Sequence, residues 1–200
     1  MSIKKKKCTL VILNYNGKEL LKECMPSILD AAKFYDSNSE VILLDNASSD
    51  DSVSFVRDNF KDVCIEEVKV NNFLFSYNNI LKKLSCEYAI LMNNDVIFSK
   101  DFIAPLLRHF DDPDVFAVGP RIYNIPGNKL FKGQMVPNFS KFWFCGSYVP
   151  DVRNACFTFS ALATTVVVDR RKFGEIGGFD ELFKPGYAED DDLCYRAWKR

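Results

Sequence analysis

The sequence contains a single histidine, His109, among its 200 residues. Metal sites built from several histidines are therefore excluded, and little room is left for a Ser-His-Asp triad. No apolar run approaches the roughly 20 residues that a membrane-spanning helix needs. The G-x-G-x-x-G and Walker A patterns are also missing, which disfavours a dinucleotide site or a P-loop.

Cysteine is present without the spacing that metal or redox sites require. The seven cysteines are an odd number and contain no C-x-x-C pair, so the patterns of zinc ribbons and redox motifs are missing. Several lie in apolar runs, where a thiol behaves as a small hydrophobic group. We expect reduced, buried cysteines and a reducing compartment.

Positive and negative charges nearly cancel, because 26 Lys and Arg residues face 27 Asp and Glu residues. This balance argues against a protein that is held to nucleic acid mainly by its charge. Lysines at positions 4–7 followed by the apolar residues 8–13 imitate a signal peptide, but the apolar part is short and no small-residue cleavage site follows. We expect a solvated basic N-terminus that leads into a first strand, and hence a cytoplasmic protein.

The length fits one domain over residues 1–200, and 48% hydrophobic residues are typical of a globular chain. In the first half, short apolar runs alternate with stretches that carry apolar residues at helical spacing. This alternation predicts an α/β fold, in which a mostly parallel sheet is flanked by helices. The expected strands are 10–13, 41–44, 64–70 and 88–92, and the expected helices are 18–34, 51–60, 76–84 and 101–110.

The character of the chain changes after Pro113, and we read residues 8–112 and 113–200 as two halves of the same domain. The second half is expected to hold strands at 116–123 and 158–168, a turn at 126–128, and an irregular loop or hairpin at 129–150. A short helix is expected at 170–176 and a final helix from Glu189 to Arg200.

Three of the expected strands end in Asn and Asp clusters. The first ends in Asn14-Tyr15-Asn16-Gly17, the second in residues 45–50, and the fourth in Asn93-Asn94-Asp95. Turn chemistry alone explains any one of them, but ligands of open parallel sheets bind outside the carboxyl ends of the strands. Three such clusters at one rim favour a binding site. Asp95 follows a buried strand there, and Asp and Asn oxygens suit Mg²⁺ or Mn²⁺ held together with substrate phosphates.

A second acidic cluster, residues 189–192, begins the final helix. Leu193, Cys194, Ala197 and Trp198 form an apolar stripe that points Asp190 inward. Asp192 and Arg196 are four residues apart, which indicates a structural ion pair. The alternative for these acids is complementation of the helix dipole at the N-terminus.

These segments, together with Gly177-Gly178-Phe179-Asp180-Glu181, resemble family 2 glycosyltransferases and most of all their rhamnosyltransferase-like branch. The resemblance covers nearly the whole chain in the order of the family. It implies a GT-A fold and an inverting transfer of sugar from a nucleotide-sugar donor. The residues that it implies for the donor are Asn14, Tyr15, Asn16, Asp45, Asn72, Asn79, Asn93 and Asn94.

By the same resemblance, Asp95 is the metal ligand, Asn93 and Asp95 correspond to the Asp-x-Asp motif, and Asp190 is the catalytic base with Glu189 beside it. The implied cofactor is Mg²⁺ or Mn²⁺, and the implied partners are a UDP-, dTDP- or GDP-sugar and a glycan or lipid-linked glycan acceptor. No nucleic acid is expected. A role in polysaccharide synthesis is implied, and peripheral contact with the inner face of the membrane stays open.

Two departures from the family pattern stand out. Asn93 replaces the first Asp of the metal motif, which predicts weaker metal binding. The donor loop usually reads Asn-x-Gly-Phe, but this chain has Leu74 where the glycine is expected. The side chain is predicted either to crowd a backbone conformation suited to glycine or to narrow the donor pocket. Because the family often continues further, the chain is read as a catalytic core truncated at its C-terminus.

Two other functions stay open at this point. A sugar-phosphate nucleotidyltransferase would share the α/β core, but the Gly-rich phosphate loop of such enzymes is missing. A non-catalytic nucleotide-sugar-binding module would keep Asp45 and need no base, and an inward-facing Asp190 argues against it. The aromatic run at 142–144 with Tyr148 fits stacking on an acceptor sugar, and core packing or a partner interface fits equally well.

Overall fold

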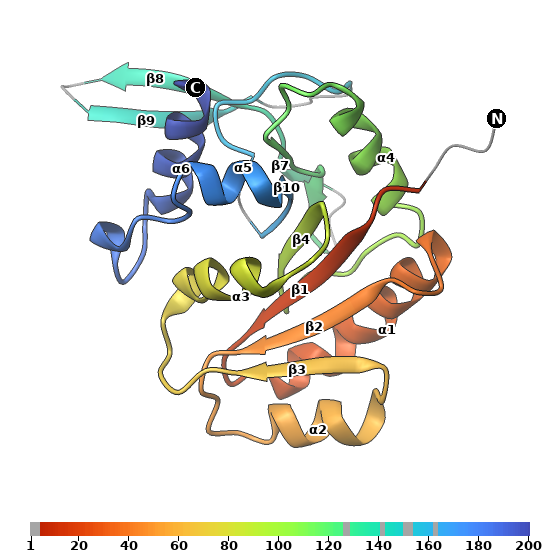
Figure 1. Cartoon of the computed structure of the whole chain (residues 1–200). Coiled ribbons are helices and arrows are strands. Elements are labelled where there is room, and N and C mark those ends of the chain that lie inside the picture. Colours follow the sequence, from red (N-terminus) through yellow and green to blue (C-terminus); the bar gives the residue numbers. More distant parts are fainter. Residues whose placement is uncertain (1–4, 126–128, 141–142, 150–153, 162–163) are drawn as a thin grey trace.

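The computed structural model describes all residues except 1–4, 126–128, 141–142, 150–153 and 162–163. Its centre is a six-stranded sheet with the strand order β3-β2-β1-β4-β10-β5 (Figure 1). The strands are β1 Cys8–Asn14, β2 Glu40–Asp45, β3 Val63–Glu67, β4 Tyr88–Asn93, β5 Ala117–Val118 and β10 Thr165–Asp169.

The first four strands are parallel, as the alternation of apolar runs and helices predicts. Each crossover runs through a helix, because parallel neighbours cannot be joined by a tight turn. Strands β10 and β5 add to the sheet in the antiparallel direction. The mixed α/β architecture with a mostly parallel sheet is therefore confirmed. The helices of this half are α1 Lys18–Tyr35, α2 Ser52–Asn59, η1 Phe73–Ser76, α3 Tyr77–Lys83, α4 Ile103–Leu107 and η2 Arg108–Asp111.

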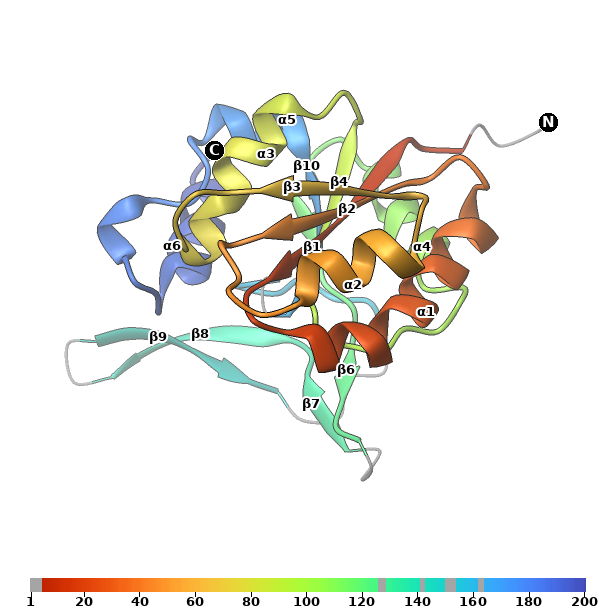
Figure 2. The same ribbon diagram turned by 90° about the horizontal axis from the view of Figure 1, so that it is seen from below.

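Helices cover both faces of the sheet (Figure 2). On one face Leu21 and Ile28 of α1 pack with Leu10 and Ile12 of β1. On the other face α3, α5 (Arg170–Glu175) and α6 (Glu189–Trp198) contribute to a second cluster around Val11. Because side chains alternate between the faces of a strand, β1 supplies both clusters from successive residues.

The second half of the chain departs from the expected elements. The strand expected at 116–123 is split at Gly119-Pro120 into β5 and β6 (Ile122–Tyr123). Of the described residues in the strand expected at 158–168, those from Thr165 onward belong to β10, and residues 158–161 lie outside any strand. Within 129–150, the described residues form β7 Leu130–Lys132 and the antiparallel pair β8 Met135–Ser140 and β9 Trp143–Tyr148, which agrees with the expected hairpin and not with the irregular loop. The turn expected at 126–128 lies outside the described residues.

The helices of this half agree better with the expectation. Helix α5 lies within the range 170–176, and α6 begins at Glu189 as the apolar spacing predicts. A short 3-10 helix, η3 Glu181–Phe183, precedes α6. Among the helices within the described ranges, none combines the length and the apolar character that crossing a membrane requires.

The cysteines whose side chains the structure describes are free thiols, and their burial differs. Cys8, Cys24, Cys86 and Cys194 are buried, as expected, whereas Cys64 and Cys156 are exposed. Burial raises the pKa of Cys8 to about 12 and that of Cys24 to about 11. These two buried thiols therefore stay protonated near neutral pH and act as small apolar side chains.

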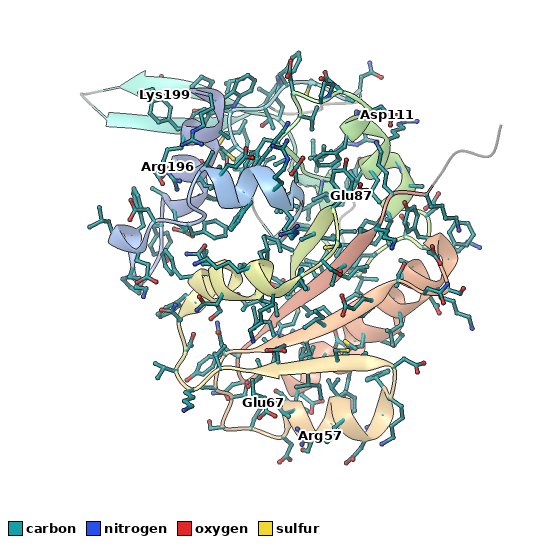
Figure 3. All side chains as sticks on the ribbon, in the orientation of Figure 1. Arg57, Glu67, Glu87, Asp111, Arg196 and Lys199 are labelled. Carbon is teal, nitrogen blue, oxygen red and sulfur yellow. The ribbon has the colours of Figure 1, made fainter. Side chains whose placement is uncertain are left out.

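The outer strand β3 carries two carboxylates that are tied to the flanking helices. Arg57 of α2 donates to Glu67 Oε1 at 3.0 Å, and Lys83 of α3 donates to Glu66 Oε2 at 2.8 Å. Figure 3 labels Arg57 and Glu67 beside the sheet edge. Adjacent residues of a strand point to opposite faces, so each carboxylate meets the helix on its own side.

The burial of β2 predicts how much a truncated core side chain lowers the free energy of unfolding. Leu43 is 0% exposed, whereas Leu182 in η3 is 88% exposed. We expect Leu43→Ala to lower the free energy of unfolding by about 2–5 kcal/mol, because the substitution removes apolar contacts and leaves a cavity. Leu182→Ala is the matched control and should stay within about 0.5 kcal/mol. Urea denaturation measures both; equal losses would contradict the core assignment.

Candidate functional site

The carboxyl ends of β1, β2 and β4 meet at one rim of the sheet. In the register of the strands, Asn14 lies opposite Asp45, and Leu13 lies opposite Asn93. The three Asn and Asp clusters that the sequence places after separate strands are therefore brought together. The strands are parallel neighbours, so their carboxyl ends lie at the same edge of the sheet, and the polar residues that follow each apolar run meet there.

Asn14 and Asp45 form the centre of a buried hydrogen-bond network at this rim. The Asn14 amide donates to Asp45 Oδ1 at 2.8 Å and to Ser48 Oγ at 3.1 Å. The Ser48 backbone N–H donates to Asp45 Oδ2 at 2.9 Å. Asn94 Nδ2 donates to Asn14 Oδ1 at 2.6 Å, so β4 joins the same network. Asp45 is only 2% exposed, and these bonds satisfy both of its oxygens.

Gly17 permits this close approach. A Cβ atom at position 17 would overlap Asn94 Nδ2 and would lie 2.6 Å from Asn14 Oδ1. Any other residue would therefore push Asn94 away from Asn14. The Gly17 backbone N–H donates to Ser52 Oγ at 3.1 Å, which ties the start of α1 to α2.

Asn16 and Tyr15 lie on the outer side of the rim. Asn16 has a left-handed backbone (φ 50°), which Asn tolerates better than most residues. Its side-chain oxygen accepts from the Ser49 backbone N–H at 2.7 Å. Tyr15 is 52% exposed. Asn16 thus shapes the loop after β2, while the Tyr15 ring is presented to solvent.

The segment expected to be a donor loop contains η1, and one expectation about it is wrong. The left-handed residue is Phe73 (φ 51°) and not Leu74. Leu74 lies inside the 3-10 helix and packs against the apolar cluster around Phe75. The side chain at Leu74 therefore crowds no backbone conformation suited to glycine. Asn72 immediately precedes this helix.

Asn46 holds the same loop and was not singled out from the sequence. Its side chain donates to the Phe73 carbonyl at 2.7 Å and accepts from the Ser76 hydroxyl. Asn46 follows Asp45 directly and is buried. No sequence signal separates it from a turn residue, because its partners lie 27 and 30 residues further on.

Of the two adjacent asparagines in α3, Asn78 is held by hydrogen bonds to another segment, whereas the sequence pointed to Asn79. Asn79 is exposed. Asn78 Nδ2 donates to the Phe179 carbonyl at 2.8 Å, and the Phe179 N–H donates to Asn78 Oδ1 at 2.9 Å. A predicted role of Asn79 toward the donor stays a prediction, whereas Asn78 connects α3 to the segment before α6.

Asn93 and Asp95 close the rim at β4. The Asn93 backbone N–H donates to the Thr164 carbonyl at 2.8 Å, and Asp95 is exposed just past the strand. Within the described ranges, no cluster of three or more His, Cys, Asp or Glu side chains is placed to hold a metal ion by itself. The exposed carboxylate of Asp95, two residues after Asn93 in the sequence, nevertheless fits Mg²⁺ or Mn²⁺, because these ions commonly take one or two carboxylates and complete their shell with phosphate oxygens and water.

The four acids at the start of α6 differ in burial, and the prediction that Asp190 points inward is only partly confirmed. Glu189 is the buried one, whereas Asp190, Asp191 and Asp192 are half-buried. The reason is the helix phase: Glu189 precedes the fully buried Leu193 by four residues, and Asp190 precedes Cys194 by four. Both acids therefore flank the apolar stripe.

The hydrogen bonds of these acids separate their roles. Asp190 Oδ1 accepts from the Asp191 backbone N–H at 2.9 Å, which is a bond in the first turn of the helix. The Arg196 guanidinium donates to Asp192 Oδ2 at 2.8 Å, so the predicted ion pair is confirmed. Asp191 Oδ1 and Glu189 Oε2 are buried without a hydrogen-bond partner among the residues that the structure describes.

Burial and neighbouring carboxylates change the pKa of two side chains at this end of α6, Asp191 and Tyr148. Burial, and then the charge of Asp190, raises the pKa of the Asp191 carboxyl, while the Ser160 hydroxyl lowers it. Burial, and then the charges of Asp190 and Asp191, raises the pKa of the Tyr148 phenol. Tyr148 of β9 therefore lies within electrostatic reach of the acids on α6.

Two cavities are lined by residues of the second half of the chain, together with residues of α4 and η2, and by none of the Asn and Asp residues that follow β1, β2 and β4. The larger, of about 780 Å³, is lined by Tyr148, Ser160, Thr165 and Trp198 among others. The smaller, of about 420 Å³, is lined mainly by apolar residues, including Phe157 and again Trp198. Of the aromatic run at 142–144, no side chain is among those described, and Tyr148 alone is placed at the larger cavity.

The parallel sheet, the polar rim and the acidic helix define a nucleotide-diphospho-sugar transferase architecture, the GT-A fold. The structure resembles the mannosyltransferase PcManGT from Pyrobaculum calidifontis in complex with GDP-Man and Mn²⁺, with a TM-score of 0.70 and 16% identity. It also resembles TarS 1-349 from S. aureus in complex with UDP, with a TM-score of 0.68 and 18% identity. These matches cover 96% of this chain and 52% and 55% of the other chains.

The sequence comparisons then define the family. The family described as "Glycosyl transferase family 2" matches residues 9–164, and the chain belongs to this family. The "SPbeta prophage-derived glycosyltransferase SunS" of Bacillus subtilis (strain 168) is 33% identical over 94 residues. That match spans 46% of this chain and 21% of the relative. The chain thus corresponds to about half the length of the two solved structures, and to less of this curated relative.

The raised pKa of Asp191 predicts a pH-dependent effect on stability. The folded chain holds the Asp191 proton more tightly than the unfolded chain does, so this contribution favours folding at low pH and is lost as the pH rises through the folded pKa. We therefore expect Asp191→Asn to raise Tm near neutral pH, and this gain to fade on acidification.

Thermal melts of the variant and the parent at neutral and acidic pH measure this effect. Asp192→Asn is the contrasting variant: it removes the ion pair with Arg196 and should lower Tm near neutral pH. A lower Tm for Asp191→Asn near neutral pH would show that the carboxylate is stabilising there.

Proposed function

We propose that this chain is an inverting glycosyltransferase that moves a sugar from a nucleotide-sugar donor to an acceptor hydroxyl. The observation that carries the proposal is the joining of Asn14, Asp45 and Asn94 at the carboxyl rim, in a chain that belongs to glycosyl transferase family 2. Open α/β sheets bind their ligands at this edge. The donor is therefore proposed to lie across the ends of β1, β2 and β4.

The nucleotide is assigned to the β1–β2 side of the rim. Asp45 is already held by Asn14 and Ser48, so its carboxylate is fixed in place before a ligand arrives. A carboxylate still accepts further hydrogen bonds from a base or ribose. Asn14, Tyr15, Asn16 and Asn94 belong to the same proposed surface, and Asn72 and Asn79 border it on the loop side.

The donor diphosphate is assigned to Asn93 and Asp95. Their oxygens would hold Mg²⁺ or Mn²⁺, and such an ion, when bound, neutralises the charge that develops on a departing diphosphate. The solved PcManGT structure contains GDP-Man and Mn²⁺ and the TarS structure contains UDP, which supports a nucleotide-sugar donor and a divalent cation here. The proposed donors are UDP-, dTDP- and GDP-sugars.

Asp190 is proposed as the general base. Its carboxylate takes the proton of the acceptor hydroxyl while the hydroxyl oxygen attacks the anomeric carbon from the face opposite the diphosphate. The bond from the anomeric carbon to the phosphate oxygen breaks, and its electron pair stays on the nucleoside diphosphate. One displacement without a protein nucleophile inverts the anomeric centre. Glu189 is buried next to Asp190 in the first turn of α6, and we propose that it assists Asp190 in catalysis.

The acceptor is assigned to the α6 side. The larger cavity is lined by Tyr148 and Ser160, and both residues lie beside the acids of α6. Exposed aromatic rings such as Tyr148 and Trp198 offer stacking surfaces for sugar rings. These features suit a glycan or a lipid-linked glycan as acceptor, in keeping with a role in polysaccharide synthesis at the cytoplasmic side of a membrane.

A non-catalytic nucleotide-sugar-binding module is the second candidate. The hydrogen bond from the Asp191 N–H to Asp190 Oδ1 favours it, since this bond alone explains an acid at a helix N-terminus. A sugar-phosphate nucleotidyltransferase has less support, because the sequence lacks the Gly-rich phosphate loop. Turnover assays with nucleotide sugars distinguish these functions: the transferase releases nucleoside diphosphate, the binding module releases none, and the nucleotidyltransferase needs pyrophosphate or a nucleoside triphosphate.

The assignment of Asp95 predicts metal-dependent binding of a nucleoside diphosphate. We expect UDP, GDP or dTDP with Mn²⁺ to raise the Tm of the parent chain, and Asp95→Asn to remove most of this metal-dependent rise, because the amide carries no charge. Asp101→Asn, an exposed acid nearby in sequence, is the control and should keep the rise. A full metal-dependent rise in Asp95→Asn would refute the assignment.

The assignment of Asp190 predicts a selective loss of transfer. Asp190→Asn keeps the shape of the side chain but cannot take a proton, so transfer at saturating donor should fall by about 10²–10⁴. Affinity for the nucleoside diphosphate should stay within about threefold, since its contacts lie on the rim and not on α6. Asp58→Asn, on the exposed side of α2, serves as the control. Transfer at the parental rate in Asp190→Asn would exclude this base.

A further inference from the structure

The turn that precedes the acidic helix is held from two sides. Gly177 and Gly178 both have left-handed backbones, with φ values of 90° and 71°. Helix α3 contacts this turn on one side and α6 on the other, although α3 lies about a hundred residues earlier in the chain. The turn therefore connects the helix that follows the donor loop to the helix that carries Asp190.

Asn78 makes the contact from α3. Its amide group both donates to and accepts from the backbone of Phe179, at 2.8 and 2.9 Å. Gly178 permits this pairing, because a Cβ there would lie 2.5 Å from Asn78 Oδ1 and 2.9 Å from Phe173 Cε1. The reciprocal bonds fix one peptide of the turn relative to α3.

Arg196 makes the contact from α6 (Figure 3). Its guanidinium donates to the Ile176 carbonyl at 2.6 Å and to the Gly178 carbonyl at 2.8 Å. The same group is bonded to Asp192 in the first turns of α6. One planar group thus joins the turn to the beginning of the helix, a geometry that a lysine cannot reproduce.

The contacts continue to the nucleotide side. Asn46, which follows Asp45, holds η1 through Phe73 and Ser76, and η1 runs directly into α3. The Tyr77 hydroxyl donates to the Met92 carbonyl of β4 at 3.0 Å, which seats the start of α3 against the rim. A series of contacts therefore extends from the proposed nucleotide side to the turn 176–179 and, through Arg196, to Asp192 in the first turn of the helix that carries the proposed base.

We propose that Asn78 and Arg196 are positioning residues for Asp190. They hold the turn 176–179 between α3 and α6 and so set the position of the first turn of α6 relative to the donor loop. Neither side chain touches the reacting atoms in this scheme. The inference rests on the proposed function, because it assigns a role toward the base that the proposed function names.

A double-mutant cycle on transfer tests this role. Arg196→Lys keeps a cation beside Asp192 but cannot serve two carbonyls and a carboxylate together, so kcat should fall by about 10- to 100-fold. Affinity for the nucleoside diphosphate should change by less than about twofold. In an Asp190→Asn background, the same Arg196→Lys change should alter kcat by less than about twofold, because the group being positioned is gone.

The control and the contradicting result are defined by the same cycle. Arg171→Lys changes an exposed arginine that pairs with Glu175 on α5, and it should leave kcat unchanged in both backgrounds. If Arg196→Lys lowers kcat by the same factor with and without Asp190, Arg196 acts independently of the base and the proposal is wrong.

Hydrogen exchange tests the other side of the turn without a substrate. Asn78→Ala removes both bonds to Phe179, and we expect amides of 189–198 to exchange faster by about tenfold, while those of β1 and β2 keep their rates. Asn59→Ala, which removes an exposed bond to the Phe55 carbonyl on α2, is the matched control and should leave α6 unchanged. Unchanged exchange in α6 of Asn78→Ala would overturn the proposed connection.

The two measurements separate this inference from the proposed function. If the parent chain transfers no sugar, or if Asp190→Asn transfers at the parental rate, the proposed function or its base is wrong, whatever the exchange of α6 shows. If Asp190→Asn lowers transfer but the cycle is multiplicative, the proposed function stands and the positioning role is rejected.

Discussion

The hydrogen bond from Asn14 to Asp45 is the interaction on which the polar half of the structure depends. Asp45 lies at the buried end of β2, where an unpaired carboxylate would cost several kcal/mol. Asn14 and Ser48 donate hydrogen bonds to the Asp45 carboxylate, and Asn94 donates one to the side-chain oxygen of Asn14. The absence of a side chain at Gly17 leaves room for the contact between Asn94 and Asn14. Three chain segments that are far apart in sequence are thereby fixed around one charge. A ligand that binds here meets a surface that is already ordered, so little ordering entropy opposes binding.

Local patterns in the sequence were sufficient for the central architecture. The four parallel strands and their helices follow from apolar runs and helical spacing, because the side-chain periods of the two structures differ. The start of α6 and the pair of Asp192 with Arg196 were predictable for the same reason, since both depend on residues within about one turn of each other. The second half was less predictable, because the short strands there depend on their cross-strand partners and on the break at Gly119-Pro120. The spacing of apolar residues reveals neither of these.

The residues that sequence reasoning missed all act over long distances in the chain. Asn46 and Asn78 look like ordinary turn and helix residues, and only the fold shows that they hold backbone groups 27 and 101 residues away. The left-handed position at Phe73, one residue before the expected Leu74, is decided by how η1 packs. The burial of Glu189 beside a half-buried Asp190 follows from the phase of α6, which an apolar stripe in the sequence defines only to within about one residue. The site acids were thus locatable from sequence, and their individual environments were not.

The carboxylates on β3 have a consequence for how copies of this chain behave toward one another. β3 ends the sheet, and an outer strand offers unpaired backbone groups to any strand of another molecule. Glu66 and Glu67 place negative charge on both faces of that strand, and the salt bridges from Lys83 and Arg57 hold the two side chains against the helices. A second copy that docked its own β3 alongside would bring like charges together on both faces and would have to desolvate them. The charges on β3 thus disfavour sheet extension and aggregation, although no other segment has to cover the backbone of this outer strand.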